Sequence, residues 1–142
     1  EDMLKLMEIE HLRKANPYDL SGGEQQRLAL AKVMVSNPDI LLLDEPTKGL
    51  DPFFKQTLGR ILRSLCKENK TIFMVSHDIE FCAEFGDRCS MFFDGEIATS
   101  GSAKEFFSGN NFYTTVENKL TRKWCEGIIT GEEARTWIRS LL

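Results

Sequence analysis

The sequence has 142 residues, 42% of them hydrophobic and 28% charged, a balance that is typical of one globular domain and excludes disordered and collagen-like chains. The net charge of -4 and the scattered basic residues disfavour nucleic acid as a partner. No apolar run reaches the roughly 20 residues that cross a bilayer, and no signal segment opens the chain, so we expect any membrane role to depend on a partner protein.

The first third of the chain predicts two helices and a strand. Residues 2–12 place apolar side chains near one stripe of a helix, which predicts a single amphipathic helix. After a loop, Ser21 and Glu24 have the spacing of a capping box and open a helix that ends before the Asn-Pro pair at residues 37–38. Residues 39–44, "DILLLD", then predict a strand that is buried on both faces, because it is apolar throughout.

The middle of the chain continues this alternation. Asp51 and Pro52 have the order of an N-cap and a first helical residue, so they predict a third helix that closes at residues 69–70. Residues 71–76, "TIFMVS", predict a second buried strand, and residues 77–86 predict a short helix ended by glycine. Strands that alternate with helices predict a three-layer α/β domain with a mostly parallel sheet, in which ligands bind at the carboxyl ends of the strands.

The last part of the chain predicts a β-hairpin followed by helices. The Asp-Gly pair at residues 94–95 lies between two strand-like runs within residues 89–101, which is the strongest short-range hairpin signal. Helix starts follow at three capping boxes, which are Ser102 with Glu105, Thr114 with Glu117, and Thr130 with Glu133. We expect residues 106–142 to form a helical tail in which Trp124 and Trp137 pack helices against the body.

Four cysteines are spread along the chain as Cys66, Cys82, Cys89 and Cys125. They form no C-x-x-C pair and have no histidines at zinc spacing, which argues against a zinc site. We therefore expect reduced thiols that are buried among apolar residues.

Two adjacent carboxylates, Asp44 and Glu45, stand where the first predicted strand ends. Because successive strand residues point to opposite faces, the two side chains cannot have the same function. In P-loop NTPases an acidic residue that closes an apolar strand helps to hold the Mg²⁺ on the nucleotide phosphates. Asp44 fits that role, and Glu45 fits a general base or water-positioning group. The alternative is that Asp44 only caps a turn before Pro46.

A second group of residues could contact phosphate. In "LSGGEQQR", residues 20–27, Gly22 and Gly23 precede a helix whose free backbone N–H groups favour an anion, and Ser21 adds a hydroxyl. The alternative is a plain helix start. His77 directly follows the second predicted strand and so reaches the same sheet edge as the carboxylates. Its imidazole could bond the terminal phosphate or the attacking water; the alternative is a surface or core histidine.

The motifs "LSGGEQQR", "ILLLDEP", "GLD" and "SHD", in this order, resemble the signature motif, Walker B, D-loop and H-switch of ATP-binding cassette (ABC) ATPases, over at least residues 18–100. The resemblance implies ATP and Mg²⁺ as cofactors, with Asp44 as the Mg²⁺ ligand, Glu45 as the catalytic glutamate and His77 as the switch histidine. It also implies a set of nucleotide-site residues, namely Ser21, Gly22, Gly23, Glu24 and the D-loop Asp51. Of these, the serine and the two glycines would touch the γ-phosphate of ATP held by the opposite subunit.

Longer stretches narrow the resemblance. "DEPTKGLDPFFKQ", "VSHDIEFCAEFGDRC" and "MFFDGEI" are similar to energy-coupling factor transporters, which import vitamins, their precursors or metal ions. The tail "FFSGNNFYTTVENKLTR" resembles their tandem ATPases, which carry two cassettes on one chain. This implies part of the ABC helical subdomain with the signature motif (1–36), the C-terminal part of the RecA-like ATPase core (37–105) and a helical tail (106–142). It also implies a second cassette and integral membrane subunits as partners, at the cytoplasmic face of the cell membrane.

The phosphate loop beside which such acidic residues work is missing from these 142 residues. That loop needs G-x-x-x-x-G-K-[ST], and the sequence contains no Gly-Lys pair. We therefore interpret the chain as the C-terminal portion of a P-loop NTPase fold, and expect no measurable ATP hydrolysis by it alone and ATP binding no tighter than about millimolar. In the family the phosphate-loop strand lies beside residues 71–76, so we expect an unpaired strand edge there, open to dimerisation or domain swapping.

Three other interpretations stay open. The C-terminal ATPase lobe of an SMC-type chromosome or DNA-repair protein is disfavoured because residues 2–12 keep no heptad. A ribosome-binding translation factor of the ABC type is disfavoured by the acidic net charge. A non-enzymatic scaffold is disfavoured because Glu45 and His77 are both intact. For the tail, the second interpretation is that it joins two ATPase subunits.

Overall fold

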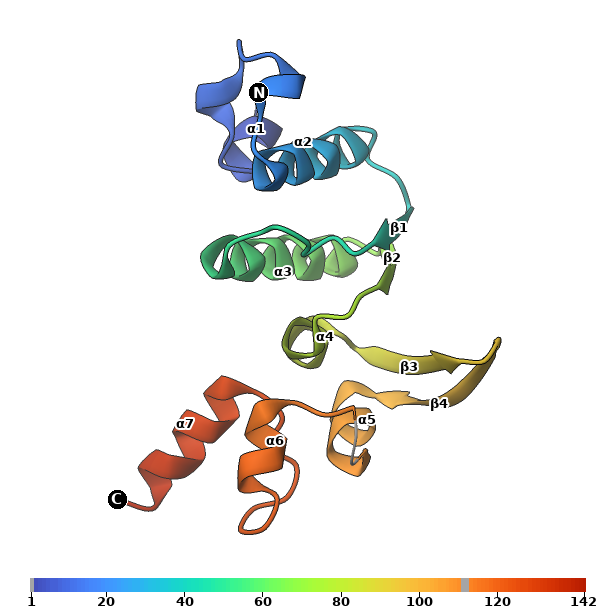
Figure 1. The fold of residues 1–142 in the computed structure, drawn as a ribbon, viewed down its shortest axis with the longest axis vertical. Helices are drawn as coiled ribbons and strands as arrows, with labels where there is room; N and C mark the ends of the chain where they lie inside the picture. The colour runs from blue at the N-terminus through green and yellow to red at the C-terminus, as the bar shows by residue number, and fades with distance from the viewer. Residues whose placement is uncertain (1, 111–112) are drawn as a thin grey trace. The chain divides into compact units, whose positions relative to one another are not determined.

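The computed structural model describes residues 2–110 and 113–142, and the chain divides after His77 into two compact units (Figure 1). The first unit contains the acidic and glycine-rich motifs, and the second contains the hairpin and the helical tail. None of the helices in these two ranges is both long enough and apolar enough to span a membrane.

The N-terminal helix α1 is shorter than the sequence predicts. It spans Asp2–Leu6, and a 3-10 turn, η1, follows at Glu10–Leu12, so the prediction of one helix over residues 2–12 is wrong. The helix ends because Glu8 adopts the left-handed conformation (φ 56). The N–H groups of Glu8 and Ile9 bond back into the last turn at 2.9 Å each, as in a Schellman-type helix end.

Helix α2, Gly22–Val35, follows a second 3-10 turn, η2 (Pro17–Asp19), and begins at the predicted capping box. The Ser21 hydroxyl accepts from the backbone N–H of Glu24 at 3.4 Å, and the Glu24 carboxylate accepts from the N–H of Ser21 at 2.8 Å. Two otherwise unpaired donors of the helix start are thereby satisfied, which confirms the box. The helix ends before Asn37 (φ 46), also as predicted.

Strands β1 (Ile40–Asp44) and β2 (Thr71–Val75) form a parallel pair, joined by helix α3 (Pro52–Lys67). Their register runs from Ile40 opposite Thr71 to Asp44 opposite Val75. A strand, a crossover helix and a parallel strand confirm the predicted α/β organisation. The two strands form a two-stranded sheet, so the outer edge of β2 has no partner strand within residues 2–110 and 113–142, as the sequence predicts.

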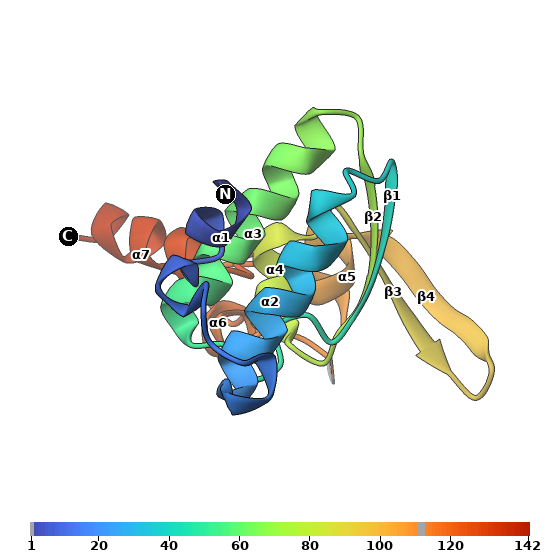
Figure 2. The ribbon, with the colours of Figure 1, turned by 90° about the horizontal axis from the view of Figure 1, so that it is seen from above.

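Only one face of this strand pair is buried. Leu41 and Leu43 are 2% and 8% exposed, whereas Leu42 and Phe73 are 74% and 64% exposed. Figures 1 and 2 both show α2 and α3 on the same side of the pair. The expectation of strands buried on both faces is therefore wrong, because the second face stays open to solvent in the described part of the chain.

Helix α3 starts as the sequence predicts. The Asp51 carboxylate accepts a hydrogen bond from the N–H of Phe54 at 2.9 Å, and Pro52 follows at the first helical position. The buried residues recur at helical spacing along one face, as Phe54, Leu58, Gly59, Ile61 and Leu62. The helix ends at Lys67, slightly earlier than predicted, because the chain turns through Asn69 in the left-handed conformation (φ 64).

All four cysteines are free thiols, as predicted. Cys66 is exposed on α3, so its predicted burial is wrong, while Cys82, Cys89 and Cys125 are partly buried. Burial raises the pKa of the Cys89 thiol, which favours the protonated and unreactive form.

The second unit begins with α4 (Ile79–Phe85) and continues into the predicted hairpin of β3 (Arg88–Phe93) and β4 (Glu96–Ser102). The two strands pair antiparallel. Asp94 and Gly95 at the turn both have positive φ, 50 and 82, as a two-residue type I′ turn requires. The Asp-Gly signal is therefore confirmed.

The tail is helical, as predicted, with α5 (Ala103–Gly109), α6 (Val116–Thr121) and α7 (Gly131–Ser140). Its core with α4 consists of Ala83, Ala103, Phe107 and Ile129. The capping boxes that begin at Ser102 and Thr130 are confirmed.

The remaining predicted box, Thr114 with Glu117, is wrong. Thr115 caps α6 instead, and its hydroxyl accepts from the N–H of Asn118 at 3.3 Å. Thr114 is buried, and its hydroxyl donates to the carbonyl of Phe107. A tertiary contact therefore uses the first threonine and leaves the second as the cap.

The two tail tryptophans differ in burial. Trp124 is 75% exposed, so its predicted packing against the body is wrong, whereas Trp137 is partly buried. Both line an apolar groove between α6 and α7. The alternative in which the tail joins two subunits stays a prediction.

Candidate functional site

The carboxyl ends of β1 and β2 bring three of the predicted residues to one sheet edge. Asp44 closes β1 and lies opposite Val75, which closes β2. Glu45 comes next, and its N–H donates to the carbonyl of Val75 at 2.9 Å. His77 comes two residues after β2. Asp44, Glu45 and His77 therefore share the edge at which parallel sheets bind ligands.

Glu45 combines a strained backbone with an unsatisfied side chain. It adopts the left-handed conformation (φ 45), which costs a non-glycine residue about 1–3 kcal/mol. Its Oε2 accepts a hydrogen bond from the backbone N–H of His77 at 3.3 Å. Its Oε1 is buried and has no hydrogen-bond partner among the described residues. Since buried acceptors are rarely left unpaired, we expect a water molecule or a ligand to hydrogen-bond to this oxygen.

The His77 imidazole lies beside the same carboxylate. Its Nε2 is 3.6 Å from Oε1 of Glu45, which is an ion pair only when the ring is protonated. The ring is 97% exposed, whereas the Glu45 side chain is 29% exposed. The imidazole can therefore reach a ligand at the strand ends while its backbone N–H fixes the carboxylate.

Asp44 has different surroundings from Glu45, as the alternation along a strand predicts. Its side chain is exposed on the open face of β1. Residues 2–110 and 113–142 contain no group of three or more His, Cys, Asp or Glu side chains that could hold a metal ion. A Mg²⁺ ion at Asp44 would therefore need phosphate and water oxygens as further ligands, which is the usual arrangement for nucleotide-bound Mg²⁺.

The turn at the start of α2 is tied together by Glu24. Its Oε2 accepts from the Ser21 hydroxyl at 2.7 Å and from the Ser21 N–H at 2.8 Å. These two hydrogen bonds hold the pKa of Glu24 below its ordinary value. A Cβ at Gly22 would meet nothing within 4 Å in the described structure, whereas a Cβ at Gly23 would lie 2.8 Å from the carbonyl oxygen of Gly49. The turn thus presents open backbone at Gly22 and tightly packed backbone at Gly23.

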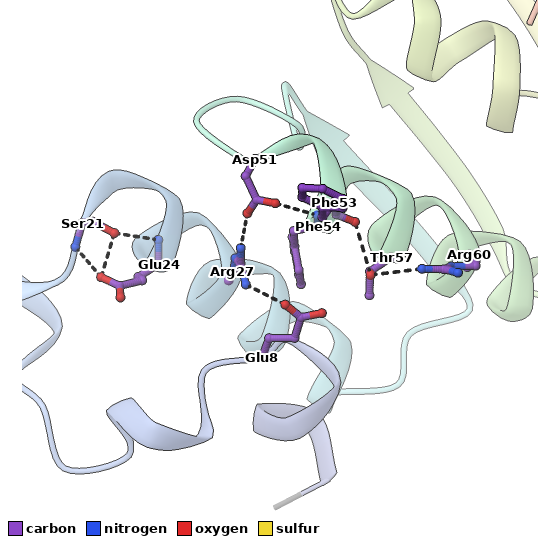
Figure 3. A network of polar contacts seen from close by, with 9 residues as sticks. All are labelled: Glu8, Ser21, Glu24, Arg27, Asp51, Phe53, Phe54, Thr57 and Arg60. Carbon is purple, nitrogen blue, oxygen red and sulfur yellow. Dashed lines mark hydrogen bonds and ion pairs between the residues drawn. The ribbon is translucent and has the colours of Figure 1, made fainter. Parts of the chain in front are cut away.

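Asp51 uses both of its carboxylate oxygens (Figure 3). Oδ1 accepts from the N–H of Phe54 at 2.9 Å, and Oδ2 pairs with Nη2 of Arg27. The hydrogen bond from Phe54, together with the charge of Arg27, holds the pKa of Asp51 below its usual range. The sequence identified Asp51 but not Arg27, because an arginine inside a helix gives no sign of a partner 24 residues away.

The predicted residues therefore gather at element ends within the first unit. Asp44, Glu45 and His77 lie at the ends of the strands, and the others lie at the starts of two helices, with Ser21, Gly22, Gly23 and Glu24 at α2 and Asp51 at α3.

Comparison with known proteins finds similarity to ABC transporter ATP-binding proteins. A family model described as ABC transporter matches residues 1–48. The chain is 50% identical over 133 residues to an ABC transporter ATP-binding protein of Bacillus cereus, covering 94% of this chain and 24% of that protein. It is 38% identical over 111 residues to the energy-coupling factor transporter ATP-binding protein EcfA3 of Oenococcus oeni, covering 78% of this chain and 38% of that protein. The chain therefore spans well under half the length of these relatives.

Solved structures show the same fold. The dimeric, post-hydrolysis ATP-binding cassette MJ0796 bound to ADP and Pi has a TM-score of 0.68 and 35% identity, covering 72% of this chain and 44% of that chain. The cbiO1 protein of Clostridium perfringens, part of the ABC transporter complex cbiONQ, has a TM-score of 0.65 and 31% identity, covering 87% of this chain and 48% of that chain. The chain thus has the fold of part of an ABC cassette and is similar in sequence to ABC transporter ATP-binding proteins along most of its length.

Proposed function

We propose that the chain is part of the ATP-hydrolysing cassette of an ABC importer of the energy-coupling factor type. The observation that carries the proposal is Glu45. It follows a parallel strand in a strained conformation and keeps one buried carboxylate oxygen without a partner in the described structure, beside His77. A carboxylate in this position can orient a water molecule and take its proton as that water attacks a phosphate.

His77 and Asp44 complete the strand-end site. The exposed His77 imidazole is the group we assign to the terminal phosphate, because it lies beside Glu45 and reaches into solvent at the same edge. Asp44 is the residue that would hold Mg²⁺, in which case the ion would neutralise charge on the terminal phosphates of ATP.

The start of α2 is the second part of the proposed site. Ser21, Gly22 and Gly23 would contact the γ-phosphate of ATP bound to a second cassette, through the N–H groups at the start of a 14-residue helix. Glu24 occupies the Ser21 hydroxyl and N–H here, so a phosphate must displace its carboxylate to use them. The solved dimer of the similar MJ0796 cassette supports a second cassette as partner.

The proposal of an energy-coupling factor importer with membrane subunits as partners depends on the similarity to two particular proteins. The matches to EcfA3 and to cbiO1 support an energy-coupling factor cassette that works with integral membrane subunits at the cytoplasmic face of the membrane. The transported substrate would be a vitamin, a vitamin precursor or a metal ion. The domain boundaries predicted at residues 36 and 105 are part of the same proposal.

The test uses the complete cassette, meaning this sequence joined to the phosphate-loop portion of the fold. Glu45→Gln should lower the ATP hydrolysis rate about 100-fold or more, because it removes a general base, and should leave ATP binding intact. Glu96→Gln, on the exposed strand β4, is the matched control and should hydrolyse ATP at the parent rate. Parent-like hydrolysis by the Glu45→Gln cassette would refute the proposal.

A further inference from the structure

The tail helices α6 and α7, which are labelled in Figure 1, line an apolar groove of about 660 Å³ that lies within the second unit. Four residues from each side line it with the spacing i, i+3, i+4 and i+7, from Glu117 to Trp124 and from Ala134 to Leu141. This spacing places one stripe of each helix on the groove. Six of the eight lining residues are apolar.

Glu117 is the only ionisable residue among these eight. Its Oε2 is buried and has no hydrogen-bond partner among residues 2–110 and 113–142. The other polar lining residue, Thr121, uses its hydroxyl to donate to the backbone carbonyl of Glu117 at 2.8 Å. A buried carboxylate oxygen is costly unless a donor reaches it, and a positively charged donor satisfies it best. A ligand that fits this groove therefore brings a cationic N–H group to Glu117.

The apolar part of the groove sets the rest of the ligand. Trp124 and Trp137 lie on opposite sides of it, and indole rings attract ammonium groups as well as apolar surface. Trp124 is 75% exposed, and Leu120 and Leu141 are each 66% exposed. These side chains gain free energy when an apolar group covers them. The volume is within the range of about 300–1,000 Å³ that small-molecule sites occupy.

We propose that the groove between α6 and α7 binds a small organic ammonium ion. An N–H of the ammonium group donates to Oε2 of Glu117, and the apolar body of the ligand packs between Trp124 and Trp137. One buried carboxylate oxygen in an otherwise apolar groove of this size matches a compact ligand with a single positive charge. This site is additional to the proposed ATP chemistry, because all of its residues belong to the second unit.

The first test titrates the complete cassette with phenethylammonium and with phenethyl alcohol, a neutral ligand of similar shape, in a calorimeter. The ammonium ion should bind with a dissociation constant below about 1 mM, and the alcohol should bind about 10-fold more weakly or worse. Because both ligands contact the same apolar surface, their difference measures the effect of the charge. No variant is needed for this comparison.

Variants then locate the charge that the ammonium ion meets. Glu117→Gln keeps the shape of the side chain and should weaken ammonium binding about 10-fold or more, while the affinity for the alcohol changes less than about twofold. Trp137→Leu should weaken the binding of both ligands about fivefold, because both pack on the indole ring. Glu132→Gln, at an exposed carboxylate of α7 that does not line the groove, is the matched control and should keep the parent affinity.

The two tryptophans report on the groove directly, because Trp124 and Trp137 are the only tryptophans in the 142 residues. In the complete cassette labelled with fluorotryptophan, Trp124→Phe and Trp137→Phe each remove one fluorine NMR signal and so assign both. Phenethylammonium should shift these two signals in the parent. The same concentration should leave them nearly unshifted in Glu117→Gln.

Equal affinities for the ammonium ion and the alcohol would overturn the proposal, as would parent-like ammonium binding by Glu117→Gln. If a second copy of the tail or another protein fills the groove instead, the fluorine signals will not respond to phenethylammonium, which also overturns it. A second copy is then identified by signals that change with protein concentration and by Leu120→Lys, which would dissociate the pair. Glu45→Gln should bind phenethylammonium like the parent, so this proposal and the proposed function fail independently.

Discussion

Replacing each glycine at the start of α2 with alanine tests the packing between α2 and the segment after β1. The two glycines are adjacent, yet their surroundings are opposite. A Cβ at Gly23 would lie 2.8 Å from the carbonyl oxygen of Gly49, a distance that real Cβ atoms essentially never show. The oxygen belongs to the backbone of Gly49, which is itself in the left-handed conformation (φ 73), and the position of a Cβ is fixed by the backbone that carries it, so neither side can yield by a side-chain rotation.

Gly23→Ala must therefore move backbone by several tenths of an ångström, and overpacking of this kind costs about 1–3 kcal/mol. Gly22→Ala places its Cβ in open space at the first position of α2, where the loss of unfolded-state freedom should stabilise the fold by about 0.4–1 kcal/mol. Urea unfolding of the complete cassette measures both, and with a slope near 2 kcal/mol per molar the Gly23→Ala midpoint should fall by about 0.5–1.5 M. Equal midpoints for the two variants would refute the close approach of Gly23 to Gly49.

Two further predictions follow from the capping boxes and from the open strand face. Hydrogen bonds from Ser102 lower the pKa of Glu105 below its ordinary 4.5. The ionised carboxylate therefore stabilises the fold at neutral pH, and this stabilisation is lost as the pH falls through the pKa of the folded state. Glu105→Gln should weaken the acid-induced drop in the urea midpoint, and an unchanged pH dependence would contradict this prediction. Phe73→Lys on the open face of β2 should reduce self-association of the 142-residue chain in sedimentation, whereas Tyr18→Lys, at an aromatic that is 90% exposed elsewhere in the first unit, should not; a parent chain that sediments as a monomer would refute it.

Local sequence signals predicted those parts of the fold that depend on few neighbours. The Asp-Gly pair at residues 94–95 adopts positive φ at both positions, and Ser21 with Glu24 satisfies the start of α2, because each signal involves groups within a few residues of one another. The same logic failed where tertiary contacts decide the outcome. A buried bond to Phe107 occupies Thr114, so the cap of α6 moves to Thr115, and no local pattern shows that bond.

For the predicted site, the location of the residues could be predicted from the sequence, whereas the detailed conformation of Glu45 could not. Motif order predicted Asp44, Glu45 and His77 at one sheet edge because the carboxyl ends of parallel strands meet there, and the structure places them there. The left-handed turn at Glu45 and its unpartnered buried oxygen in the described structure could not be predicted, because both depend on how the chain leaves β1.

The uniform apolar pattern of β1 does not distinguish its buried face from its exposed face. Leu41 and Leu42 are chemically identical, yet one is buried and the other is 74% exposed. An apolar side chain on that open face gains about 1.5–3 kcal/mol only when something covers it. The pattern therefore predicts that something covers this face, and the proposed assignment to an ABC cassette would supply such a layer on the face that carries Asp44. Leu42 and Asp44 lie on the same open face of β1. An element that covers Leu42 must therefore also leave room for phosphate beside Asp44.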